Sequence, residues 1–343
     1  MRSRRLTPKR FFATLLLLLA CLAASLLLAL AVGSARLSPS AMLAAVFGQG
    51  EPEETSTILW QVRLPRALLA ALAGAALSCA GTAFQAVLRN PLADPYILGI
   101  SGGAALGAIS SSLSGVDRGG MGWLARPLCA FAGAGLTVLA ILALSRWRGV
   151  VASTSMLLIG WVFNSFFLAM ILFLETAVDF AKVRGAIFWL VGTLAPESYA
   201  VLAGIGVAVA SGAGVLWLFA RELDLICAGE ETARHLGCDV QRTRLVGILA
   251  ASLITAAVVS FCGLIGFVGL IVPHSARYLF GPDHRLLLPA SALLGAAGLV
   301  VADTLSRTLL APTEIPVGVL TVLIGGPAFV LLYRRHRAEV SLE

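Results

Sequence analysis

Long apolar runs separated by short polar segments dominate the hydrophobic pattern of the chain. Because an α-helix rises about 1.5 Å per residue and the hydrocarbon core of a bilayer is about 30 Å thick, roughly 20 apolar residues form one spanning helix. The pattern therefore predicts an all-α polytopic membrane protein with about ten transmembrane helices. The expected spans lie near residues 11–32, 65–88, 96–113, 124–144, 150–173, 199–220, 245–262, 264–280, 286–305 and 316–333.

The apolar run over residues 245–279 is too long for one span, and Arg277 is its single charged residue. One helix of this length would extend about 50 Å. We expect the run to break among Gly263, Gly266 and Gly269.

The distribution of arginine and lysine predicts the orientation. Ten spans place both termini on one side of the membrane. If that side is the cytoplasm, 17 of the 25 basic residues lie on the inner side, as the positive-inside rule expects. The sequence thus favours an N-in, C-in arrangement. Spans two to five begin outside and spans seven to ten begin inside, which predicts an inverted repeat of these two groups.

The first span has an alternative interpretation as a signal peptide. Basic residues precede it, and Ala29-Leu30-Ala31 resembles a cleavage site before Val32. Its apolar stretch of about 22 residues exceeds the usual 7 to 15 of a signal peptide. An uncleaved membrane helix is therefore the preferred interpretation.

Composition excludes several classes of protein. The chain is 59% hydrophobic and 13% charged, with a mean hydropathy of +0.93, whereas soluble domains carry about 25% charged residues. The net charge of +7 could suit nucleic acid, but the basic residues are scattered between apolar runs. Neither lysine, Lys9 or Lys182, follows a glycine, so a Walker A loop is absent and any ATP must bind another subunit.

Catalytic and metal sites find no support in the sequence. The six cysteines and four histidines are dispersed without metal-ligand spacing. No clustered nucleophile or acid–base pair suggests a membrane enzyme. We therefore expect no catalytic residue and no metal site in this chain.

Polar residues at the expected outer surface could bind a docking protein. Arg63 and Arg66 open the second span one helical turn apart and could receive carboxylates as bidentate pairs. They could equally extend to lipid headgroups. Asp303 and Arg307 are four residues apart near the end of span nine, so we expect them to pair on one helix face. Glu314 lies at the start of the last span.

Two segments on the expected inner side carry further polar residues. Asn90-Pro91 predicts a tight turn after the second span, which would suit a gate or a subunit contact but also an ordinary loop. The glycines of residues 99–104 are expected to allow close helix packing. In the inner loop, residues 229–237 predict a short amphipathic helix whose apolar face holds Ala233 and Leu236. This helix could dock into a partner or simply connect two spans.

Several segments of the sequence, taken in order along the chain, resemble the FecCD-type permease subunits of type II binding-protein-dependent ABC importers. That family takes up iron-siderophores, heme and vitamin B12. The matching strings cover nearly everything after residue 60. They are residues 63–66, 85–107, 189–192, 229–237, 263–274, 302–318 and 326–327.

The resemblance implies a single transmembrane permease domain over residues 1–343 with a cytoplasmic coupling loop at 221–244. It implies binding-protein docking by Arg63, Arg66 and Arg307. It implies an ATPase-coupling segment made of Gly229, Glu230, Glu231, Thr232, Ala233, Arg234, His235, Leu236 and Gly237. It implies a cytoplasmic gate made of Asn90, Pro91, Leu92, Ala93, Asp94, Ser153, Thr154 and Ser155.

The resemblance also implies the assembly and the transport reaction. Two copies of the permease pair in the bacterial inner membrane, two ATP-binding cassette subunits carry ATP and Mg²⁺, and a periplasmic or lipid-anchored binding protein delivers the chelate. Spans five and ten are expected to line the pathway. The cargo would be an iron-siderophore, heme or cobalamin, and the chain itself would catalyse no covalent step.

An alternative is an ion-coupled secondary transporter that acts without an ATPase. Such a protein needs carboxylates inside its spans. Asp303 is the single acidic residue well inside an apolar run, and it lies near a helix end. The sequence therefore favours the ABC importer permease.

Overall fold

The computed structural model describes residues 6–33, 53–96, 98–114, 122–147, 150–151, 153–176 and 190–340. Its elements are α1 (Pro8–Ala31), α3 (Glu53–Thr57), a π-helical turn (Ile58–Arg63), α4 (Leu64–Val87), α5 (Ile100–Ser114), α6 (Gly122–Leu144), β1 (Arg146–Trp147), β2 (Val150–Val151), α7 (Ser153–Thr176), α9 (Tyr199–Leu218), α10 (Ala220–Ala228), α11 (Glu230–His235), α12 (Val240–Cys262), α13 (Val268–Phe280), α14 (His284–Thr308) and α15 (Val317–Val340). Apart from the small β1–β2 hairpin, these elements are helical.

The predicted helical membrane fold is confirmed, whereas ten full-length spans are not. Within the described ranges, seven helices are long and apolar enough to cross a membrane. The expected spans at 96–113 and 264–280 become the 15-residue α5 and the 13-residue α13, and the apolar part of the last helix is Val317–Leu331. Hydropathy counts apolar residues whether or not they are helical. The first residues of both expected spans form irregular turns, so α5 and α13 are shorter than the apolar runs that predicted them.

The expected break in the run over 245–279 occurs at Gly263. Helix α12 ends at Cys262, and the amide of Gly263, at φ 67°, donates to the Val259 carbonyl. Phe267 precedes α13 in a left-handed conformation, which is uncommon for a residue with a side chain. The chain therefore leaves helical geometry for only a few residues before it resumes as α13.

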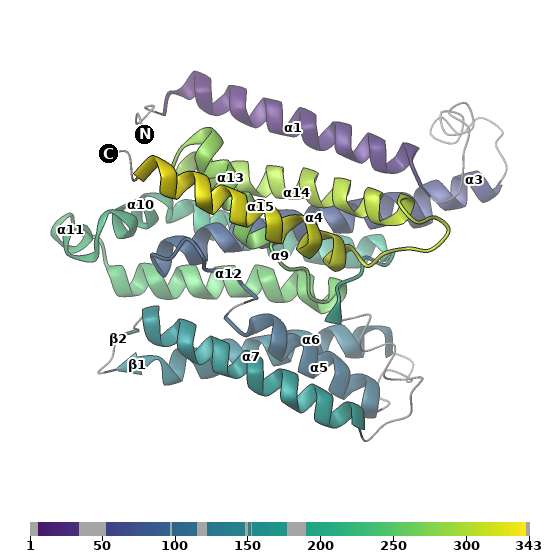
Figure 1. The fold of residues 1–343 in the computed structure, drawn as a ribbon, viewed down its shortest axis with the longest axis horizontal. Helices are drawn as coiled ribbons and strands as arrows, with labels where there is room; N and C mark the ends of the chain where they lie inside the picture. The colour runs from purple at the N-terminus through teal and green to yellow at the C-terminus, as the bar shows by residue number, and fades with distance from the viewer. Residues whose placement is uncertain are drawn as a thin grey trace.

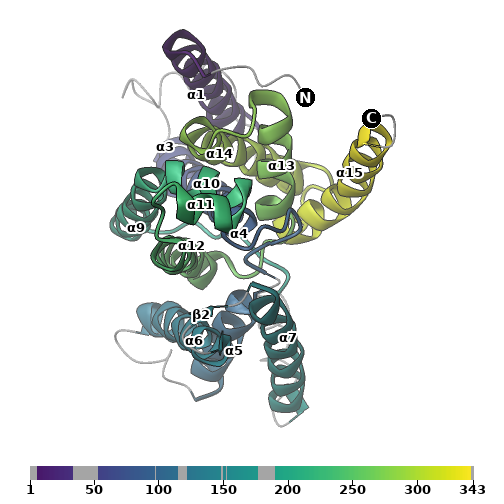
Figure 2. The ribbon, with the colours of Figure 1, turned by 90° about the vertical axis from the view of Figure 1, so that its left-hand side faces the viewer.

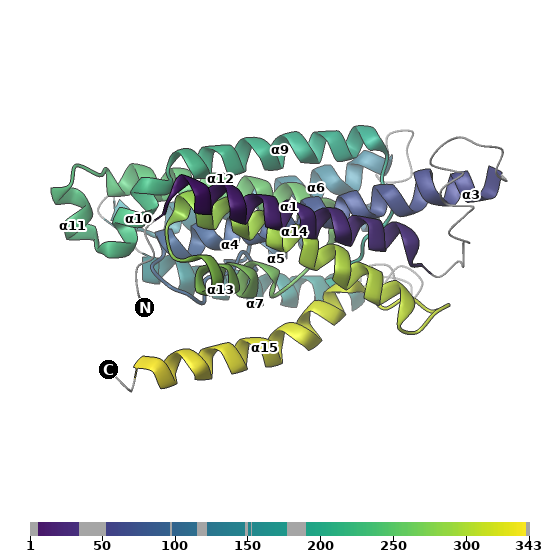
Figure 3. The ribbon, with the colours of Figure 1, turned by 90° about the horizontal axis from the view of Figure 1, so that it is seen from above.

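The helices run side by side along the long axis of the molecule (Figure 1). Helices α10 and α11 lie at one end, where α1 begins and α15 finishes, and α3 lies at the opposite end. Viewed from the α11 end, α5, α6 and α7 form a group on one side of the remaining helices, and α15 stands away from its neighbours (Figure 2). The view from above also shows α15 diverging from the other helices (Figure 3).

Helix α4 is the buried centre, and its glycines allow close approach of its neighbours. A Cβ atom on Gly74 would lie 2.1 Å from the Gly295 carbonyl oxygen of α14, and one on Gly81 would lie 1.9 Å from the Gly269 carbonyl oxygen of α13. Neither position can hold a larger side chain without moving backbone. The expected packing role of residues 99–104 is also confirmed, because a Cβ on Gly103 would lie 2.0 Å from a side-chain oxygen of α6.

The two groups of four helices that the sequence relates as an inverted repeat have matching lengths. Helices α4 to α7 contain 24, 15, 23 and 24 residues. Helices α12 to α15 contain 23, 13, 25 and 24 residues. The short second helix in each group follows an irregular segment, so the lengths agree with the inverted repeat, which stays a prediction.

Candidate functional site

A cluster of four charged side chains joins the end of α14 to the start of α4. Asp303 Oδ2 pairs with Arg307 Nε at 3.0 Å, so the expected i,i+4 pair is confirmed. The other oxygen of Asp303 accepts a hydrogen bond from Arg66 Nε at 3.0 Å, and Arg66 Nη1 donates to Glu314 Oε2 at 2.8 Å. The Asp303 side chain is 1% exposed, so the cluster is centred on a buried carboxylate.

Arg63 has a different environment from Arg66 and Arg307. Its side chain is buried, and its Nη1 donates to the carbonyl oxygens of Leu30 and Ala31 at the end of α1. Such contacts satisfy carbonyls that a helix end leaves without partners. Of the three arginines that the sequence predicts to dock a protein, only Arg66 retains appreciable side-chain exposure, at 11%.

The predicted polar turn after α4 is present. Arg89 adopts a left-handed conformation with φ 48°. Asn90 Oδ1 then accepts a hydrogen bond from the Leu92 amide at 2.9 Å, and Asp94 Oδ1 accepts one from the Tyr96 amide at 2.8 Å. Burial raises the pKa of the Asp94 carboxyl to about 6, although the hydrogen bond from the Tyr96 amide opposes that rise.

The remaining expected gate residues lie at the start of α7. Thr154 is exposed and Ser155 is half-buried, whereas the side chain of Ser153 lies outside the described residues. Helix α7 contacts the segment after the turn further along its length, where Asn164 Nδ2 donates to the Tyr96 carbonyl at 3.0 Å. The hydrogen bonds of the described residues thus connect α7 to this segment through Asn164.

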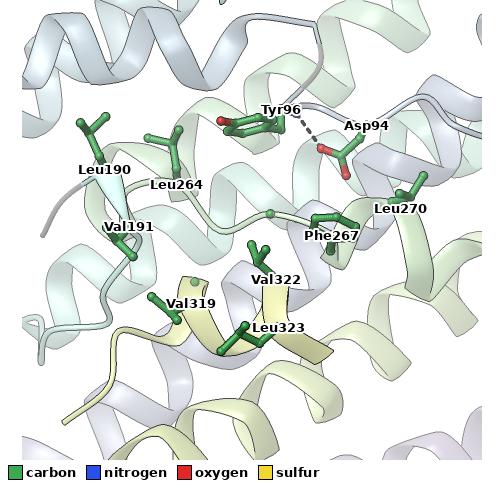
Figure 4. A pocket seen from close by; sticks show the side chains of 12 residues that line it. Asp94, Tyr96, Leu190, Val191, Leu264, Phe267, Leu270, Val319, Val322 and Leu323 are labelled. Atoms are coloured by element: carbon green, nitrogen blue, oxygen red, sulfur yellow. Dashed lines mark hydrogen bonds between the residues drawn. The ribbon is translucent and has the colours of Figure 1, made fainter. Parts of the chain in front are cut away.

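An apolar cavity of about 610 Å³ lies beside α15, and Asp94 is the one acidic residue among its described lining residues (Figure 4). Its wall is formed by residues 94–96, 190–191, 264–267 and the first turns of α15. This cavity could not be predicted from the sequence. Most of its wall comes from irregular segments, which have no hydrophobic period to detect.

Helices α7 and α15 also expose large apolar side chains. Those of α7 include Trp161, Phe166 and Phe173, and those of α15 include Leu323 and Leu331. In Figure 2 these two helices lie along the same side of the molecule. Such faces are stable only against lipid or another protein surface.

The short helix predicted within residues 229–237 is α11. Gly229 and Gly237, with φ of 132° and 80°, lie just outside its two ends. Ala233 is fully buried, whereas Leu236 is 62% exposed, so the expectation that they share one apolar face is wrong. The helix ends at His235, and Leu236 turns outward in the cap.

Arg244 ties α11 to α4. Its guanidinium binds the Glu230 carboxylate, and its Nε donates to the Val87 carbonyl at 3.4 Å. The Arg244 side chain is almost fully buried. This contact could not be predicted from the sequence, because Arg244 is one of several basic residues near a span end.

Comparison with known proteins identifies relatives over almost the whole chain. The chain matches the FecCD transport family over residues 18–335. It is 40% identical to the ABC transporter permease protein YvrB of Bacillus subtilis over 94% of this chain and 93% of the relative. It is 38% identical to the hemin transport system permease protein HmuU of Yersinia pestis over 92% and 95%.

Further similarity comes from a cobalamin permease and a solved structure. The cobalamin import system permease protein BtuC of Halobacterium salinarum is 43% identical over 83% of this chain and 75% of that protein. A metal-chelate type ABC transporter solved in an inward-facing conformation superposes with a TM-score of 0.81 at 29% identity, covering 94% of this chain and 99% of that one. The chain belongs to the FecCD transport family.

Proposed function

We propose that this chain is the membrane-spanning permease subunit of an ABC importer for an iron-siderophore, heme or cobalamin-type chelate. The family match over residues 18–335 carries the proposal. The relatives include permeases for hemin and for cobalamin. ATP hydrolysis on a separate subunit would drive import across the inner membrane, while the permease changes shape and makes no covalent bond.

The ion-coupled alternative loses the carboxylate on which the sequence made it depend. Asp303 is buried between Arg66 and Arg307, with both oxygens engaged. A carboxylate paired with two guanidinium groups has little remaining capacity to bind and release a cation. We therefore retain the importer as the single proposed function.

The pathway would form between two copies of the chain. The apolar faces of α7 and α15 lie on one side of the molecule, and the cavity of about 610 Å³ borders α15. Pairing two such surfaces would remove both faces from lipid and bring the two cavities toward a common axis. An apolar wall suits passage of a bulky chelate without tight binding.

The α11 end would face the cytoplasm and bind the ATPase, with both termini on that side. Movement of α11 would reach the end of α4 through Arg244, which contacts both Glu230 and the Val87 carbonyl. The turn at Asn90 to Asp94 begins only a few residues later. Residues 229–237 would thus act on the gate, which comprises 90–94 and 153–155, through one buried arginine.

The binding protein would dock at the opposite end. Arg66, Arg307 and Arg63 are the proposed acceptors of its carboxylates. Because Arg66 Nη1 already binds the half-exposed Glu314, an incoming carboxylate would compete with Glu314 for this guanidinium. Docking at Arg66 is therefore a competition between two carboxylates.

Reconstitution in proteoliposomes tests the function. With its ATPase and binding protein, the chain should import chelate only in the presence of ATP. Uptake by the chain alone, driven by an ion gradient, would refute the proposal. Binding of siderophore, heme and cobalamin to the cognate binding protein, measured by calorimetry, would identify the cargo.

A further inference from the structure

A second cavity, of about 770 Å³, lies at the α11 end of the molecule. Its wall combines α10, the turn after α4 and the junction between α13 and α14. Unlike the apolar cavity beside α15, it is lined by charged and polar side chains. Those that matter here are Gln85, Arg89, Asp224, Cys227, Arg277 and His284.

Two arginines of this lining have no acidic partner within the described ranges. Arg89 follows α4 in its left-handed conformation, and Arg277 belongs to the last turn of α13. Neither guanidinium makes an ion pair or a hydrogen bond with any of the described residues. A left-handed residue other than glycine costs of order 1 kcal/mol or more, which is typical of functional positions.

The two guanidinium charges act on a common point. Burial raises the pKa of the Cys227 thiol; the positive charges of Arg277 and Arg89 oppose that rise, and the negative charge of Asp224 adds to it. The effect of both charges on one side chain of α10 indicates that they border the same space. An anion in that space would meet two donors that arrive from different elements.

One oxygen of each carboxylate in the same lining is engaged within the chain. Asp224 Oδ1 accepts from the His284 amide at 3.1 Å and contacts His284 Nδ1, and Asp283 Oδ1 accepts from the Arg285 amide at 3.0 Å. In addition, Gln85 Oε1 and His284 Nε2 are buried without a partner among the described residues. Unsatisfied polar atoms of this kind mark a place where a polar ligand or water completes the structure.

We propose that this cavity receives an acidic side chain of the ATPase subunit, held by Arg89 and Arg277. The inference rests on the proposed function, because it requires the α11 end to be the ATPase face. A protein that covers α11 also covers α10, which walls the cavity. Charge-assisted hydrogen bonds from two guanidinium groups are among the strongest polar contacts available to a carboxylate.

This contact would give the ATPase a direct connection to the gate. Arg89 immediately precedes the Asn90-Pro91 turn, and both turn residues border the cavity. The contact through α11 reaches the same turn only by way of Arg244 and the end of α4. The ATPase would therefore hold the permease at two points, and the second point would lie on the gate turn itself.

The test is the affinity of the ATPase for the full-length permease in nanodiscs, measured with R89E/R277E and with R285E as control. Arg285 is exposed, carries the same charge and lies next to the cavity without lining it. We expect R89E/R277E to weaken binding by about tenfold or more and R285E to weaken it by less than about threefold. R89Q/R277Q, which adds no negative charge, should give an intermediate loss.

Assembly of the variant into a dimer and docking of the binding protein serve as folding controls. An acidic-to-arginine substitution in the ATPase that restores binding of R89E/R277E would identify the partner side chain. Equal ATPase affinity for R89E/R277E and R285E would overturn the inference. So would unchanged ATPase affinity with a loss of bound anionic lipid, since the cavity would then bind headgroups.

The outcomes also separate this inference from the proposed function. If wild-type permease does not bind the ATPase, both fail. If wild-type permease binds, and replacing Glu230 to Arg234 abolishes binding while R89E/R277E does not, only the cavity contact fails.

Discussion

The two ends of the molecule use arginine in opposite ways. At the α3 end, Arg66 and Arg307 surround Asp303, and Glu314 accepts a hydrogen bond from Nη1 of Arg66. At the α11 end, Arg89 and Arg277 border a cavity and have no carboxylate within ion-pair distance among the described residues. The first group stabilises the chain by itself, whereas the second needs an anion from outside.

This difference predicts different binding behaviour at the two ends. A protein that docks at the α3 end competes with an internal carboxylate, so the net gain from a new pair with Arg66 is small and reversible. At the α11 end, no carboxylate of the described residues pairs with Arg89 or Arg277, so a docking protein has no such competitor. The comparison therefore predicts weak, exchangeable docking at one end and durable assembly at the other.

The largest expected effect comes from D303N. This substitution leaves Arg66 and Arg307 buried without their charge partner, which costs about 3–5 kcal/mol in the free energy of unfolding. Thermal unfolding in detergent should show a clear fall in the midpoint. A fall no larger than that of E314Q would mean that the cluster does not hold α14 to α4.

The second prediction concerns the pH dependence of Asp94. Its pKa rises from 3.8 to about 6 on folding, so the folded state binds the proton more tightly, and stability is lost as pH rises from about 4 to about 6. D94N removes this loss and keeps an oxygen for the Tyr96 amide. We expect D94N to match wild type near pH 4 and to exceed it by up to about 3 kcal/mol at pH 7.5.

Thermal unfolding of both proteins across this pH range checks the prediction. If the two curves run parallel, the Asp94 carboxylate is not destabilised by burial. E54Q, which changes an exposed carboxylate at the opposite end, is the matched control and should show no such divergence.

Replacing Arg244 by alanine should uncouple α11 from α4. The buried contacts with Glu230 and the Val87 carbonyl disappear, and we expect a loss of about 1–3 kcal/mol together with ATP hydrolysis that no longer drives import. R234A is the control, since Arg234 is mostly exposed and its pair with Glu230, at 3.7 Å, contributes less than about 1 kcal/mol. Normal import by R244A in proteoliposomes would contradict this route.

The smallest expected change in stability belongs to E314Q, at less than about 1 kcal/mol, because the Glu314 side chain is 44% exposed. Its effect on docking is more informative. Freeing Arg66 Nη1 removes the internal competitor, so the binding protein should bind about threefold to tenfold more tightly. Surface plasmon resonance with E54Q as the reference measures this. Weaker docking would show that Glu314 itself contacts the binding protein.

Local signals in the sequence predicted local structure well. Gly263 marked the end of α12, Asn90-Pro91 marked the turn, and the four-residue spacing of Asp303 and Arg307 marked their pair. Each depends on residues a few positions apart. Hydropathy overestimated the length of α5 and α13, because an irregular apolar segment and a helical one have the same hydropathy.

Contacts between distant residues could not be predicted in this way. Arg66 and Asp303 are 237 positions apart, and Arg244 reaches Val87 across 157. Neither polar cluster has a period or a motif, since each is assembled only when helices pack. For the same reason Arg89 and Arg277 looked like ordinary basic residues at span ends.

The short helices α5 and α13 have a consequence for what the transport path presents to its cargo. The irregular segments before them, residues 88–96 and 263–267, both supply part of the wall of the cavity beside α15. Side chains that they place there, such as Leu264 and Phe267, are apolar, as is most of the wall. A passing chelate would therefore meet few groups that make directed hydrogen bonds. Such a wall discriminates little between cargoes, which leaves selection to the protein that delivers them.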